Sequence, residues 1–258
     1  MIPFFRKIRK KMADDNRPLQ YARYAIGEIV LVVIGILIAL QINNWNEDRK
    51  SRIEEIEILK SIKLDFINVI DECKENNEFR KKIIASTNEF YQIINNPSHG
   101  YSEVQLDSIM ANLFINPTYN NKTGSLDILF TSGKINAISQ PKIKDALILW
   151  PQQIDDVMED EIYSSESLRY DFYPFIRKYI SIQKVNKQIQ YKNLELFDRS
   201  IHSGFESDYE GLLSNMEFEG LLATRELTLS VSLLQTNDLI ETAEGIIALI
   251  DAKIKSRN

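Results

Sequence analysis

The chain has 258 residues, a formal net charge of −6 and a sequence pI of about 5.2. An acidic chain makes a poor general binder of nucleic acids, so we expect no nucleic-acid partner, and its one cysteine, Cys73, excludes an intramolecular disulfide. Glycine and proline are scarce, with nine and seven residues, and apolar residues recur three and four positions apart, which indicates an all-α protein.

Residues 1–23 form a basic segment that carries seven Lys or Arg against two Asp, although the chain as a whole is acidic. Its stretch "PFFRKIRKKM" mixes apolar and cationic side chains. We expect Phe4 and Phe5 to enter a membrane interface and Arg6 and Arg9 to meet anionic lipid headgroups, at about 1 kcal/mol per cation. The alternative is a solvated basic tail. The segment is therefore predicted to be a cytoplasmic amphipathic anchor.

Residues 24–45 are predicted to form a single transmembrane helix. Twelve consecutive apolar or small residues occupy positions 29–40, and the wider stretch 25–42 has 18 residues without a charge other than Glu28. Eighteen helical residues span about 27 Å, close to the ~30 Å hydrocarbon core of a bilayer. Tyr24 and Trp45 flank the stretch, as aromatic interface anchors do.

Two other interpretations of this stretch are weaker. A cleaved signal peptide needs small residues before its cleavage site, and residues 40–45, "LQINNW", contain none. A buried helix of a soluble protein does not need seven cations in front of it. We therefore expect an uncleaved signal anchor, and the excess of Lys and Arg before it predicts a cytoplasmic N-terminus with the chain beyond residue 43 on the other side.

Glu28 stands in the first turn of the predicted membrane helix. It shares a helix face with Gly35 and Ala39, whose small-xxx-small spacing lets a second helix approach closely. In one interpretation Glu28, Gly35 and Ala39 form a face that binds a partner helix. In the other, Glu28 is an interfacial carboxylate that reaches the headgroups, and the two small residues are incidental.

Residues 46–258 are predicted to form an extracytoplasmic antiparallel helical bundle, whose long helices follow residue 43, follow residue 141 and precede residue 255. The first long helix should end near Asn95. A helix over residues 102–114 should begin at Ser102 as its N-cap, and a short helix over 125–131 should end at Gly133.

Prolines punctuate the second half of the predicted bundle. Pro141 suits the first turn of a helix, and Pro151 and Pro174 should kink or divide the helices that follow. We expect Ser207 to cap a helix that starts at Asp208, and a last helix over residues 217–255.

Motifs for chemistry are not found in the sequence. It has two histidines and one cysteine, which cannot form a structural zinc site, and no HExxH, GxSxG or GxGxxG pattern. We therefore expect no metal, no cofactor and no enzymatic activity. An aromatic and basic group that includes Tyr170, Tyr173 and Arg177 could line a ligand pocket, although aromatic core packing explains the same pattern.

Three stretches resemble a large bacterial family of single-pass membrane proteins of unknown function: "FFRKIR", "YAIGEIVLVVIGILIALQINNWNE" and "FINPTYNNKTGSLDILFTSGKINAI". The resemblance implies an inner-membrane anchor with a helical domain on the periplasmic side, and it carries no activity or ligand.

Three functions remain open from the sequence. The first is a membrane-anchored interaction or scaffold protein, whose partner is a membrane protein or a second copy of the chain. The second is an extracytoplasmic sensor that holds a ligand between helices. The third is an accessory subunit of an ion-coupled membrane complex, in which Glu28 carries a proton.

Overall fold

A computed structural model describes residues 18–96, 98, 100–120, 123–189 and 202–256, with side chains from Ala25 onward and at Ala22. Every regular element within these residues is a helix, which confirms the predicted all-α class. The chain divides into two compact units, Met1–Glu57 and Ile58–Asn258.

Helix α2, Pro18–Ile94, is continuous over 77 residues and ends one residue before the predicted limit at Asn95. Among the described residues it is the one helix that is long and apolar enough to cross a membrane, with a mean hydropathy of 2.6 over its most apolar 18-residue window. None of that window is buried, which distinguishes it from a core helix of a soluble protein. The predicted limits of the membrane segment, 24–45, stay a prediction.

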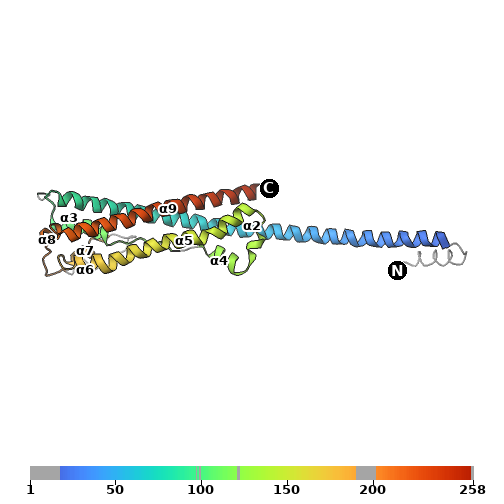
Figure 1. Cartoon of the computed structure of the whole chain (residues 1–258), viewed down its shortest axis with the longest axis horizontal. Helices are drawn as coiled ribbons and strands as arrows, with labels where there is room; N and C mark the ends of the chain where they lie inside the picture. Colours follow the sequence, from blue (N-terminus) through green and yellow to red (C-terminus); the bar gives the residue numbers. More distant parts are fainter. Residues whose placement is uncertain (1–17, 97, 99, 121–122, 190–201, 257–258) are drawn as a thin grey trace. The chain divides into compact units, whose positions relative to one another are not determined.

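Three long helices form the frame of the second unit: the part of α2 from residue 58 onward, α5 (Pro141–Ser167) and α9 (Met216–Lys255) (Figure 1). Helix α9 is antiparallel to α2, because Lys63 pairs with Asp251 whereas Phe90 stacks on Phe218. Helix α5 runs in the same direction as α2, since Phe66 contacts Trp150 and the later Arg80 contacts Glu161. The antiparallel prediction is therefore correct for α9 and wrong for α5.

The parallel course of α5 follows from the segment before it, which brings the chain back along α2. Helix α3, Glu103–Leu113, starts at Ser102 as predicted, with a capping box in which Ser102 and Gln105 bond each other's backbone N–H groups. The loop after α3 then runs antiparallel to α2 as far as α4, Gly124–Thr131. Gly133, in left-handed conformation with φ 69°, separates α4 from the 3₁₀ helix η1, Lys134–Ala137.

The prolines act differently from the prediction. Pro151 lies inside a continuous α5, and the α-helical pattern is interrupted only by a π-helix, η2, at Leu168–Phe172. Pro174 follows in the first turn of α6, Tyr173–Ile176. Because Pro174 has no N–H to donate one turn back, a locally wider turn is accommodated there.

Two short helices complete the unit: α7, Ile182–Asn186, and α8, Tyr209–Leu213. The expectation that Ser207 caps a helix from Asp208 is wrong by one residue. Asp208 is itself the N-cap, since its carboxylate accepts the N–H of Gly211 at 2.7 Å.

Two apolar clusters fill the second unit. The first combines residues 59–73 of α2 with α5 and the C-terminal half of α9, and includes Phe66, Trp150 and Cys73. The second combines residues 83–93 of α2 with α3, η2, α6 and the N-terminal half of α9. Cys73 is fully buried as predicted, and burial raises the pKa of its thiol to about 12.

The conformation of two exposed glycines predicts opposite effects of alanine. A Cβ at Gly133 or at Gly220 would meet no atom within 4 Å, so only the backbone differs. Gly133→Ala places a side chain at positive φ and should lower the free energy of unfolding by about 1–2 kcal/mol. Gly220→Ala lies inside α9 and should raise it by about 0.5–1 kcal/mol. Urea unfolding followed by circular dichroism measures both, and equal shifts would contradict the assignment.

Candidate functional site

The residues of the predicted partner-helix face are open to the surroundings. Gly35 and Ala39 are exposed on α2 and Glu28 is half-buried. A Cβ at Gly35 would meet nothing within 4 Å. Spacings of seven and four residues place the three on one face of the helix.

The predicted interface anchors are only partly within the described residues. Trp45 is described and is 62% exposed on α2. Phe4, Phe5, Arg6 and Arg9, together with the side chain of Tyr24, lie outside the described residues, and their roles remain predictions.

The aromatic and basic group of the predicted pocket does not line either of the two cavities described below. Tyr170 is 62% exposed and Arg177 is also exposed. Tyr173 is half-buried and donates its hydroxyl to the carbonyl of Phe114 at 3.3 Å, while its ring packs against the Phe114 ring. Tyr173 therefore packs against the core, as the alternative interpretation of this group expects.

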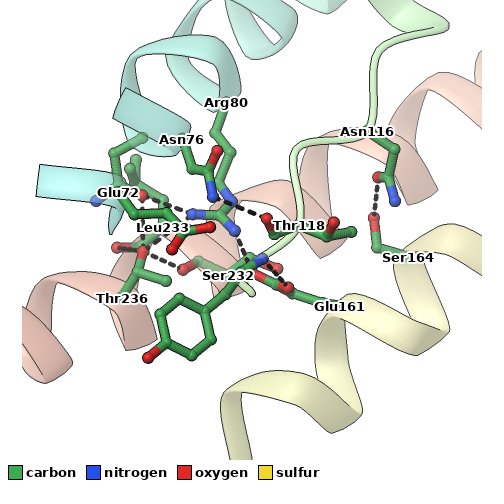
Figure 2. Close-up of polar contacts among 12 residues, drawn as sticks. Glu72, Asn76, Arg80, Asn116, Thr118, Glu161, Ser164, Ser232, Leu233 and Thr236 are labelled. Atoms are coloured by element: carbon green, nitrogen blue, oxygen red, sulfur yellow. Dashed lines mark hydrogen bonds and ion pairs between the residues drawn. The ribbon is translucent and has the colours of Figure 1, made fainter. Parts of the chain in front are cut away.

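A layer of buried polar residues separates the two apolar clusters of the second unit (Figure 2). It contains side chains from all three long helices, and we call it the buried polar layer: Asn76, Asn77, Arg80, Glu161, Ser164, Arg225, Thr228, Ser232 and Thr236. Buried polar groups are tolerated only when they are hydrogen-bonded, so the partners of each charge determine what the layer does.

Arg80 is fully buried and joins the three long helices. Its guanidinium forms an ion pair with Glu161 of α5, and donates to Asn77 of α2 at 2.8 Å and to Thr236 of α9 at 3.3 Å. The hydroxyl of Thr236 in turn donates to Asn77 at 2.7 Å. These contacts have the directional character that fixes the register of packed helices.

The same layer holds the loop between α3 and α4. The second oxygen of Glu161 accepts the backbone N–H of Tyr119 at 2.7 Å, and Asn76 donates to the carbonyl of Thr118 at 3.0 Å. Glu72 accepts the backbone N–H of Asn120 at 3.0 Å. The loop therefore contributes its backbone groups to the interior, where they replace lost water contacts.

Arg225 holds the beginning of that loop from the side of α9. Its guanidinium donates to the carbonyl of Ile115, to Asn116 Oδ1 at 3.1 Å and to Ser164 Oγ at 3.1 Å. Within the described part of the chain, no carboxylate lies at ion-pair distance from Arg225. Burial lowers its pKa to about 10, so Arg225 keeps its charge at neutral pH.

The arrangement of charges makes the layer structural and leaves Glu161 poorly suited to acid–base chemistry. Burial lowers the pKa of Arg80 and raises the pKa of Glu161, because both charged forms lose water. Their mutual attraction opposes both shifts. Both oxygens of Glu161 are already engaged by Arg80 and by the Tyr119 N–H.

The sequence contains a signal for this layer that the apolar stripe of α2 conceals. The stripe was predicted to continue from Cys73 through Phe79 to Ile83, yet Phe79 is only half-buried. Asn77 and Arg80 occupy the inward positions instead. Polar residues at the helical spacing of a core stripe are the feature that predicts such a layer.

Two cavities lie at the opposite end of the unit from the layer's first cluster, around α3. One, of about 440 Å³, is lined by Glu103, Val104, Asp107, Lys184, Lys187, Gln188, His202 and Ser203. The other, of about 580 Å³, shares Glu103 and has no Lys or Arg in its lining. No group of three His, Cys, Asp or Glu in the described residues could hold a metal ion.

The layer predicts a specific pattern in a double-mutant cycle. Arg80→Met leaves Glu161 buried without its cation, and should lower the free energy of unfolding by about 3–5 kcal/mol. Adding Glu161→Gln removes the unpaired charge and keeps an oxygen for the Tyr119 N–H, so the double variant should be more stable than Arg80→Met alone. Additive losses, measured by urea unfolding, would show that the two side chains are not coupled.

Comparison with protein families gives one match, over residues 28–164, to a family described as a family of unknown function (DUF6090). The match extends from Glu28 of α2 to Ser164 of α5 and includes the loop that the buried polar layer holds. Comparisons with curated proteins and with solved structures found no match. Since the matched residues make up more than half of the chain, the protein belongs to this family of unknown function, DUF6090.

Proposed function

We propose that the protein is a membrane-anchored interaction or scaffold component of the bacterial inner membrane. The observation that carries the proposal is the apolar part of α2, in which the most apolar window has none of its residues buried. In water such a surface would be strongly unfavourable, whereas in a bilayer it is the surface that lipid and partner helices contact. The bacterial and inner-membrane assignments rest on the sequence resemblance.

The distribution of charge supports an orientation with the N-terminus in the cytoplasm. Seven Lys or Arg occupy the basic segment before the apolar stretch. On the other side, the basic residues nearest the stretch, including Arg49 and Lys50, are accompanied by Glu47 and Asp48. By the positive-inside rule, the helical unit from residue 58 onward would then lie in the periplasm.

The face of Glu28, Gly35 and Ala39 is the surface proposed to bind another transmembrane helix. In lipid, helix association depends on close packing and interhelical hydrogen bonds, and small residues permit both. The surrounding residues Ile34 and Ile38 are exposed and apolar, so Gly35 forms a shallow recess between larger side chains. A second copy of the chain or another membrane protein would satisfy this surface.

Photocrosslinking in native membranes tests the proposed face. A photoreactive residue at Gly35 should give a discrete protein adduct, whereas the same residue at Leu37, two positions around the helix, should give mainly lipid adducts. Gly35→Leu should reduce crosslinking from a probe at Ala39, and Gly27→Leu is the control, since Gly27 is also exposed on α2. Equal labelling from Gly35 and Leu37 would leave the helix as a plain anchor and refute the partner.

A further inference from the structure

The smaller of the two cavities has charged groups of both signs. We call it the α3–α7 cleft; it lies between Glu103, Val104 and Asp107 of α3 and the residues in and just after α7, with His202 and Ser203 at its edge. Its volume of about 440 Å³ is within the range of pockets that hold small molecules.

Asp107 provides a buried carboxylate in the lining of this cleft. It is 3% exposed, and its one hydrogen bond within the described residues comes from the Tyr209 hydroxyl to Oδ1 at 2.6 Å. Burial raises the pKa of Asp107, despite the Tyr209 hydrogen bond and the nearby Lys184, which both lower it. A buried carboxylate with so little compensation is best satisfied by a cation that enters from the cleft.

The nearest basic residue is already engaged. Lys184 donates to Glu103 at 2.8 Å, and this hydrogen bond is the main cause that lowers the pKa of Glu103. Lys184 therefore neutralises Glu103, while the charge of Asp107 is left for a group that the chain does not supply within the described residues.

A second basic residue in the lining lacks an acidic partner. Lys187 makes its one hydrogen bond within the described range to Nδ1 of His202, at 3.4 Å. Its ammonium thus lies beside a neutral ring nitrogen rather than a carboxylate. A ligand carboxylate at this position would accept from Lys187 and have the Ser203 hydroxyl in the same lining.

We propose that the α3–α7 cleft binds a small zwitterion that carries a primary ammonium and a carboxylate, such as an amino acid. The ammonium meets Asp107 and the carboxylate meets Lys187, so each ligand charge is paired with a side chain of opposite sign. This inference goes beyond the proposed membrane interaction and does not depend on it. It places a ligand site in a different part of the unit from Tyr170, Tyr173 and Arg177.

Isothermal titration calorimetry on the full-length protein in nanodiscs tests the proposal. The probes are the proteinogenic L-amino acids, β-alanine and γ-aminobutyrate, which vary the separation of the two charges, with propylamine and propionate as single-charge controls. At least one zwitterion should bind, and each single-charge control should bind at least about tenfold more weakly, because one charge-assisted hydrogen bond is lost.

Three variants locate the site. Asp107→Asn keeps an oxygen that accepts from Tyr209, and Lys187→Gln changes a partly exposed side chain, so both should fold. Each should weaken zwitterion binding at least about tenfold. Lys142→Gln, on the exposed surface of α5, is the matched control and should leave binding unchanged.

Three outcomes would overturn the proposal. No zwitterion binds to the wild-type protein; a zwitterion binds Asp107→Asn or Lys187→Gln as tightly as wild type while circular dichroism shows both variants folded; or propylamine or propionate alone binds as well as the zwitterion. The last outcome would replace the zwitterion by a simple cation or anion.

Discussion

The buried ion pair between Arg80 and Glu161 is the constraint on which the rest of the helical unit depends. Two charges removed from water are tolerated only when their geometry and remaining hydrogen bonds are satisfied together. Here that condition requires α2, α5, α9 and the loop before α4 to be in one register, because Thr236 and the Tyr119 N–H complete the set of contacts. Apolar packing alone would permit helices to slide; the polar layer does not.

The layer divides the unit into regions with different tasks. Below it, the cluster around Trp150 is entirely apolar and gives the unit its stability. Beyond it, α3, α7 and α8 are short, and two cavities open between them. Short helices with few neighbours are the part of a fold that can adjust to a ligand, whereas the layer keeps that adjustment from disturbing the long helices.

Local signals account for what the sequence predicts well. The Ser102 cap, the Pro141 start and the positive φ of Gly133 are each encoded within a few residues, so the helix limits follow from them. The direction of α5, the role of Arg80 and the cleft at Asp107 depend on contacts between segments far apart in the chain. A polar residue on a core stripe gives a hint of such contacts, but periodicity alone does not identify its partner.

Hydrogen exchange at the Tyr119 amide tests the account most directly. This N–H lies in a loop rather than a helix and donates to Glu161, so its protection depends on the polar layer. The account predicts that Tyr119 exchanges as slowly as the amides of the surrounding helices, and that Arg80→Met selectively accelerates it. Fast exchange at Tyr119 in the wild-type protein would show that the layer does not hold the loop and would contradict the account.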